Sequence, residues 1–309
     1  MFKTATTNKR AGKQGWKAMG LFIIVLAAFA NARGESKPHS WNVALFGGGI
    51  FGRNGDAGTF IREYDRYYQT MAEAYGSSKS GTLNWPGAGM EFGAEIGYSL
   101  SSRLSVGMAV ERLSKKMEGS FTLGLWTGDN LNSGTSHFME MTLSATSISA
   151  FGRYSMPLAK AVSIVYRAGF GILSGSLDRV LMRRYPDISD EWALTGEYSA
   201  SGMTGQAGVG LTWDLTPRIA LQLEGGYRLA SLSNWSGKNT YTWGPETDET
   251  RGDLNYLEIQ GDERNPAVYH PSLAVGDPNI VLGVVSYQAC KTGFTGLFFK
   301  AGFVVRFGR

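Results

Sequence analysis

The stretch that ends the chain, Phe294 to Phe307, constrains the fold most. Every second residue from Leu297 to Phe307 is apolar, and Lys300, Gly302 and Arg306 fall between these positions. A period of two predicts a β-strand with unlike faces. In a water-soluble sandwich the apolar face would point to the core, whereas in a transmembrane barrel it would point to lipid. One strand leaves both architectures open.

Similar alternation recurs along the chain, and the lengths of the connections decide between the two. Seven earlier strands are predicted, at about 41–51, 90–100, 104–126, 138–154, 162–172, 206–214 and 219–229. The second, fourth and sixth are followed by turns of a few residues. The others are followed by longer polar connections, at about 52–87, 127–137, 174–202 and 236–293. Outer-membrane barrels have an even strand number, short periplasmic turns and long external loops.

We therefore predict an all-β fold, an antiparallel up-and-down transmembrane β-barrel over residues 41–309. Eight strands fit the pattern best. The segment Ile280 to Gln288 also has strand character, and with a partner near Leu254 to Ile259 it would make a barrel of ten strands.

One helix is predicted inside the first long connection. Phe60, Tyr64, Tyr67, Met71 and Tyr75 recur at helical spacing, and Gly76 would end the helix. We expect this helix to pack on the barrel mouth, and the alternative is a lid over a ligand.

The N-terminal segment predicts export. Five basic residues precede the 13-residue apolar run Ala18 to Ala30, which is too short to span a bilayer as a helix, and Ala30-Asn31-Ala32 suits a signal peptidase. We predict a cleaved signal peptide over 1–32, with a retained anchor as the alternative, and a short periplasmic segment over 33–40. Without the five basic residues, the 30 Lys and Arg no longer outnumber the 26 Asp and Glu, so the charge does not indicate nucleic-acid binding. A single cysteine, Cys290, excludes an internal disulfide.

Given the signal peptide, the sorted loops and the final strand, the sequence resembles the small bacterial outer-membrane barrels. These are the OmpA-type transmembrane domain and the opacity-protein, OmpX and OmpW groups. The resemblance is one of pattern and covers residues 41–309. It implies that Phe303, Val305 and Phe307 belong to a C-terminal signal read by the barrel-assembly machinery, although Gly308 and Arg309 follow the aromatic residue.

Charged residues on the faces opposite the apolar ones predict a closed lumen. An eight-stranded barrel is only wide enough for side chains to fill, and acidic and basic groups should therefore meet across it. The expected members are Glu91, Glu95, Glu111, Arg167, Glu224, Arg228, Lys300 and Arg306. This favours a structural or surface-interaction role in the envelope, and the alternative is a narrow porin-like channel for small solutes.

Two basic groups are expected near the outer membrane surface. Lys115 and Lys116 follow the spanning part of the third strand, and Arg179, Arg183 and Arg184 follow the fifth. They would contact lipopolysaccharide phosphates or form a solvated rim.

No catalytic, cofactor or metal residue is predicted. A rim enzyme acting on lipids or peptides is the least favoured alternative, because His39, His137 and His270 have no recognisable spacing to Ser136, Asp129, Asp262 or Glu263. Asp187, Asp190 and Glu191 lack a calcium-loop pattern. The run Gly47 to Gly52 lacks the Gly-Lys-Ser/Thr ending of a phosphate loop.

Overall fold

The computed structural model describes residues 40–53, 55–74, 76–84, 87–124, 126–127, 130–131, 134–184, 191–260, 269–277 and 284–307. The predicted signal peptide lies outside these residues and stays a prediction. The described elements are the helix α2 (Gly55–Ala74) and the strands β1 (Trp41–Arg53), β2 (Lys79–Thr82), β3 (Ala88–Ser99), β4 (Leu104–Leu123), β5 (Trp126–Thr127), β6 (Asn130–Leu131), β7 (Thr135–Ala159), β8 (Val162–Arg184), β9 (Glu191–Asp214), β10 (Ile219–Trp243), β11 (Glu246–Gln260), β12 (Tyr269–Val275), β13 (Val284–Ala289), β14 (Thr292–Gly293) and β15 (Thr295–Phe307).

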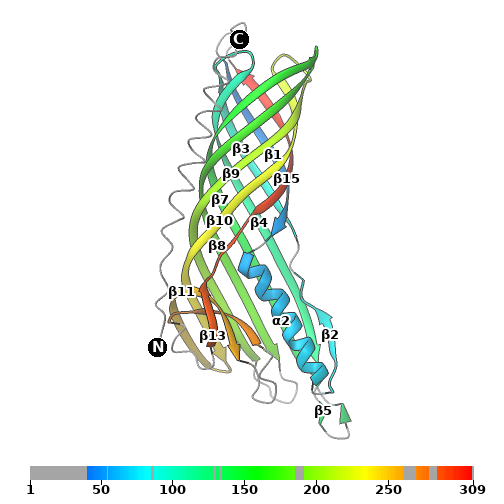
Figure 1. Ribbon diagram of the computed structural model, residues 1–309, viewed down its shortest axis with the longest axis vertical. Coiled ribbons are helices and arrows are strands. Elements are labelled where there is room, and N and C mark those ends of the chain that lie inside the picture. Colours follow the sequence, from blue (N-terminus) through cyan, green and yellow to red (C-terminus); the bar gives the residue numbers. More distant parts are fainter. Residues whose placement is uncertain are drawn as a thin grey trace.

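Strand pairing closes the sheet into a long barrel (Figure 1). The strands β1, β3, β4, β7, β8, β9, β10 and β15 pair antiparallel in a closed circuit, each with its neighbour in this order, and β15 returns to β1. A row of paired residues that leaves β10 at Leu221 and passes once around the circuit returns to β10 at Ser231. The strands are therefore tilted against the barrel axis. The predicted antiparallel barrel is confirmed.

Of the two segments considered for a ten-stranded barrel, 254–259 lies in β11 and 284–288 lies in β13, and these strands pair with each other, whereas 280–283 lie outside the described residues. β13 runs antiparallel to residues 255–259 of β11. β10, however, pairs with β15 along its first part and with β11 only from Ser236 onward. β11 and β13 therefore lengthen the wall beyond the closed circuit. Among the described residues the sheet has 13 strands, and the number that cross a membrane stays a prediction.

The outer surface of the barrel carries a continuous apolar belt. On β8 the outward side chains Tyr166, Phe170 and Ile172 are exposed, and the next outward residues are Ser174 and Ser176. The apolar belt comprises Trp41, Leu45, Phe51, Met90, Phe92, Ile96, Met108, Val110, Ile148, Tyr166, Phe170, Ile172, Met203, Val209, Leu211, Trp213, Ile219, Leu223, Tyr227, Leu229, Leu297, Phe299, Phe303, Val305 and Phe307. Exposed apolar surface of this extent on a closed barrel suits lipid tails.

Beyond the belt, the strands continue where the sequence predicted loops. The expected loop over 174–202 is wrong, because β8 extends to Arg184 and β9 begins at Glu191. Residues 236–243 likewise belong to β10 rather than to a loop. The alternation persists with reversed polarity, with polar side chains outward and leucines inward, as in a water-soluble barrel. We call this part of the barrel, which includes residues 174–184, 191–202 and 236–243, the outer half.

A bulge in β10 adjusts this strand where the outer half begins. The pairing with β9 shifts between Ser233 and Ser236, and Asn234 has φ 57°. Asn tolerates this left-handed conformation better than most residues. The bulge changes the inward position from Leu232 to Trp235, so both side chains reach the interior.

The predicted helix is confirmed as α2, and it completes the interior of the outer half (Figure 1). Its buried residues Ala57, Phe60, Ile61 and Tyr64 join one core cluster with side chains of the long strands. Lys291 N donates to Asp56 Oδ2 at 2.7 Å, and Leu83 N donates to Asp65 Oδ1 at 2.8 Å. These bonds fasten the helix near its start and near its middle to the strand segments beside it.

Candidate functional site

The interior at the level of the apolar belt gathers eight charged side chains from six strands. Each residue is at most 7% exposed, and four carboxylates face four cations. We call this set the lumen network. It consists of Glu91 and Glu95 (β3), Glu111 (β4), Arg153 (β7), Arg167 (β8), Glu224 and Arg228 (β10) and Lys300 (β15).

Arg228 is a central member of this network. Its Nη2 atom lies 2.8 Å from Glu91 Oε1 and 2.8 Å from Glu111 Oε2, and it donates to Gln206 Oε1 at 2.7 Å. The residue is 0% exposed. Ion pairs of this kind are charge-assisted hydrogen bonds, which are stronger than neutral ones.

Arg167 joins carboxylates that come from different sides of the barrel. Its Nη1 atom lies 3.1 Å from Glu95 Oε2 and 3.6 Å from Glu224 Oε2, and Arg153 also pairs with Glu95. The Arg167 guanidinium lies 4.4 Å from the Phe151 ring centroid, within cation–π distance.

Lys300 is another cation of the lumen network and lies between two of its carboxylates. Its Nζ atom lies 3.7 Å from Glu111 Oε1, 3.6 Å from Glu224 Oε1 and 4.5 Å from the Phe46 ring centroid. The space beside Glu95, Glu224 and Lys300 is a cavity of about 10 Å³, enough for at most one water molecule.

The sequence predicted seven of these eight residues and missed Arg153. Arg153 has the same strand parity as the buried Ser147, Ser149 and Phe151, and this parity was a usable signal. Arg306, which was also predicted, lies apart from the network. It pairs with Asp214 at 2.6 Å beside a polar cavity of about 220 Å³ at the end of the barrel with the short turns. The expectation that Arg306 belongs to the central network was therefore wrong, because its position on β15 is at the strand end.

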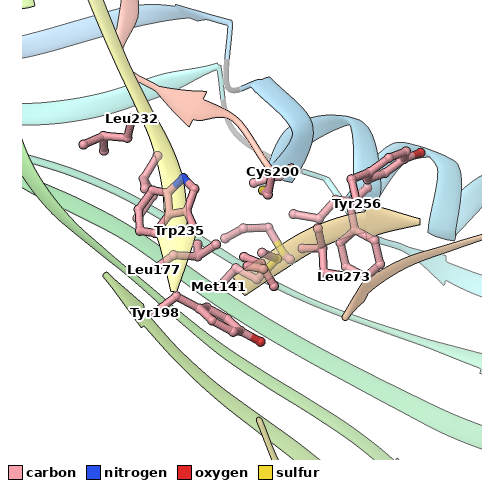
Figure 2. Packing of buried hydrophobic residues seen from close by; sticks show 14 of the residues in the cluster. Met141, Leu177, Tyr198, Leu232, Trp235, Tyr256, Leu273 and Cys290 are labelled. Carbon is pink, nitrogen blue, oxygen red and sulfur yellow. The ribbon is translucent and has the colours of Figure 1, made fainter. Parts of the chain in front are cut away.

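The interior of the outer half is mainly apolar (Figure 2). Met141, Leu177 and Leu232 are 0% exposed, and Trp235 is 1% exposed. Figure 2 shows Tyr198, Tyr256, Leu273 and Cys290 in the same packing. Met is unbranched and fills irregular gaps, so the interior is closed here by packing rather than by charge.

The residues predicted to contact lipopolysaccharide do not all face the same way, because odd and even positions of a strand point to opposite sides. Lys115 and Arg179 are 1% and 2% exposed and point inward, so the expectation for both was wrong. Arg179 donates to Leu273 O at 3.0 Å and to Asn239 Oδ1 at 3.2 Å.

Arg183 also points inward, where its Nη2 donates to Tyr64 Oη at 3.2 Å. Only Lys116 and Arg184 face outward, and they pair with Glu140 at 3.2 Å and with Glu191 at 3.1 Å. Each group of neighbouring residues was assigned to one surface, at the outer end of a predicted strand or in the loop after it, whereas in a strand neighbours face opposite sides.

The arrangement at His137 does not suit a catalytic base. Ser136 is outward and exposed, whereas His137 is inward, 4% exposed and stacked on Phe121 with ring centroids 4.6 Å apart. Burial, with a smaller effect of Arg183, lowers the pKa of His137 to about 3. His39, Asp129, Asp187, Asp190, Asp262 and Glu263 lie outside the described residues, as does the side chain of His270. Within the described part of the chain, no group of three or more His, Cys, Asp or Glu could hold a metal ion.

The C-terminal signal residues lie on the strand that closes the circuit. Phe303, Val305 and Phe307 all face outward on β15, which pairs with β1 on one side and β10 on the other. Their reading by an assembly machinery stays a prediction.

No family model matches the chain, and no curated protein matches it by sequence. Three solved structures are similar to it: a major outer membrane protein from Thermus thermophilus, the outer membrane protein OprG from Pseudomonas aeruginosa, and the outer membrane protease OmpT from Escherichia coli. Their identities are 12%, 10% and 11%, and their TM-scores are 0.38, 0.33 and 0.30. The matches cover 88%, 89% and 89% of this chain and 100%, 99% and 99% of those chains.

The TM-scores are all below 0.5. The observations that bear on a membrane location are therefore the outward apolar belt and the charged interior of this chain. Among the described residues, no helix has the length and apolar character needed to cross a bilayer.

Proposed function

We propose that this protein is an integral bacterial outer-membrane β-barrel with a structural or surface-interaction role and a lumen closed to solutes. The lumen network carries the proposal. Eight buried charges of balanced sign span the interior at the level where the outer surface is apolar. An unpaired charge there would be costly, and paired charges hold opposite walls together. Insertion would depend on the barrel-assembly machinery acting on the last strand.

A second seal supports the same role. Beyond the lumen network, the path along the barrel axis enters the apolar core that contains Met141, Leu177 and Trp235. A hydrated solute would have to pass charges that are already paired and then a packed apolar interior. Removal of one seal should therefore leave the other closed.

Conductance in a planar bilayer tests the proposal. We expect no stable single-channel steps from the purified wild-type protein, and none from a variant with Glu91, Glu95 and Glu111 changed to alanine. Heat-modifiable migration in detergent gels would first establish that the variant folds. Stable steps from the wild type would contradict a closed lumen and favour a narrow channel. If the triple variant showed steps and the wild type did not, the lumen network would be the barrier to solutes, and the apolar core would not act as a second seal.

A further inference from the structure

The apolar belt ends at hydroxyl-bearing rows on five neighbouring strands. Val110, Ile148, Ile172 and Met203 pair side by side and are the last apolar outward residues of β4, β7, β8 and β9 in the belt. The next outward row across the same strands and β10 is Arg112, Thr146, Ser174, Ser201 and Ser233, and the row beyond it is Ser114, Ser144, Ser176, Ser199 and Ser236. We call these two sets the hydroxyl rows.

Arg112 is the one charged residue in the hydroxyl rows. Its Nη1 donates to Thr146 Oγ1 at 3.1 Å, and its Nη2 donates to Ser144 Oγ at 2.9 Å. Ser144 Oγ lies 3.0 Å from Ser176 Oγ, which continues the polar surface to the next strand. Arg112 is exposed, and among the described residues no carboxylate lies within ion-pair distance of its guanidinium, although the more distant carboxylate of Asp178 on β8 interacts with it electrostatically.

The position of Arg112 calls for an external anion. Arg112 pairs in register with Phe92, and Met90 pairs with Ser114, so exposed apolar belt residues flank it on β3. A charge at the edge of lipid tails is costly without a counter-ion. The two hydroxyls use two of the five guanidinium N–H groups, and the others remain for an acceptor. Phosphate matches this planar donor geometry.

Lys116 provides a contrast on the same strand face. Its Nζ atom lies 3.3 Å from Glu118 and 3.2 Å from Glu140, so its charge is already neutralised by the protein. The chain thus places two carboxylates in ion-pair contact with the cation farther from the belt. The cation at the belt edge contacts hydroxyls directly and has only the more distant carboxylate of Asp178 as a counter-charge.

We propose that Arg112 and the hydroxyl rows bind the phosphorylated sugar headgroup of an outer-leaflet glycolipid. Arg112 would hold a phosphate, and the row hydroxyls other than that of the buried Ser144 would exchange hydrogen bonds with sugar hydroxyls above the lipid tails. The hydroxyl rows are several strands wide and their serines carry no charge. They therefore suit an uncharged sugar headgroup better than they suit a phosphate alone. This inference rests on the membrane placement proposed above.

Binding of purified lipopolysaccharide to the refolded protein in phosphatidylcholine vesicles tests the inference. We expect Arg112→Gln to raise the Kd about tenfold, the size expected for loss of one charge-assisted hydrogen bond. The control Lys116→Gln should change the Kd less than about twofold, because a paired surface charge contributes little. Lipopolysaccharide stripped of its phosphates should bind the wild type and Arg112→Gln equally.

Equal affinities of the wild type and Arg112→Gln for intact lipopolysaccharide would overturn the inference, as would an equal cost of Lys116→Gln. If Arg112→Gln fails to fold, the double variant Ser174→Val, Ser201→Val replaces it, with an expected loss of about threefold from lost neutral hydrogen bonds. An unchanged Kd in that variant would overturn the role of the hydroxyl rows. Failure of the wild type to insert into vesicles free of lipopolysaccharide would instead count against the proposed membrane protein itself.

Discussion

The same strands enclose a charged interior at belt level and an apolar interior in the outer half. At belt level the outward residues are apolar, and the inward ones include Glu91, Arg167 and Arg228. On β8, only six residues after Arg167, the inward residue is Leu173, and Leu177 and Leu181 follow it. The strand pairing is continuous through both regions.

This contrast shows which solvent each region faces. Where lipid surrounds the wall, apolar side chains gain nothing by turning inward, so the interior is held by ion pairs and hydrogen bonds. Where water surrounds the wall, the hydrophobic effect drives leucine, methionine and the buried face of α2 to the inside. The boundary between the two regimes is therefore visible as a reversal of polarity on β4, β7, β8, β9 and β10.

The largest expected effect comes from breaking the charged interior. Arg228→Met should lower the free energy of unfolding by about 3–5 kcal/mol, because Glu91 and Glu111 would lose their 2.8 Å partner in a buried site. Urea unfolding of the refolded protein in vesicles measures it. The control Arg251→Met removes an exposed pair with Glu249 and should cost at most about 1 kcal/mol. Similar losses in both variants would mean that the lumen network is not desolvated.

Adding Glu91→Gln to Arg228→Met should recover part of the loss, since Glu91 then no longer needs a cation and the network again has equal numbers of carboxylates and cations. No recovery would indicate that Arg228 acts mainly by packing.

A cavity in the outer half should cost slightly less. Leu177→Ala, at a residue that is 0% exposed, is expected to lower the free energy of unfolding by about 2–5 kcal/mol. Met182→Ala on the outward face of the same strand, at 41% exposure, should stay within about 0.5 kcal/mol. Equal costs at the two positions would contradict an apolar core inside the outer half.

The belt itself is tested by a charge on its surface. Phe303→Arg, with the side chain facing lipid, should cost about 2–4 kcal/mol in vesicles. At the adjacent Gly302 an alanine should destabilise for another reason, because its Cβ would collide with the Leu45 carbonyl oxygen and the Phe46 side chain. Refolding in vesicles of two bilayer thicknesses separates the effects, since only the first depends on lipid. Equal tolerance at both positions would rule out a lipid-facing stripe.

The smallest expected effect is a pH dependence of the outer half. His137 lies at the outer end of β7, beyond the belt, and burial lowers its pKa to about 3. Below the ordinary histidine pKa of about 6.5, the unfolded chain takes up a proton that the folded chain does not. Stability should therefore fall as the pH falls from about 6.5 toward 3, by about 2 kcal/mol at pH 5.

His137→Phe preserves a ring on Phe121 and should remove this part of the pH slope, as measured by hydrogen exchange of the outer strands at pH 5 and pH 7.5. An unchanged slope in the variant would assign the pH dependence to other groups.

The sequence by itself determined the barrel at belt level. There, alternation, short turns and the unlike faces of each strand all follow from residues two apart, and they predicted the outward belt and seven of the eight lumen charges. These are local signals, because lipid outside and polar groups inside impose one consistent polarity on each strand.

Only the tertiary structure decided what happens beyond the belt. The segments 174–184 and 191–202 are each polar on the outward face and largely apolar on the inward face, the reverse of the membrane pattern, and were therefore predicted as a loop. Whether Lys115 or Arg179 meets lipid headgroups or a buried core depends on which face the surrounding strands and α2 enclose. That enclosure arises from contacts between segments far apart in the chain, such as Arg179 with Leu273, and no local period encodes them.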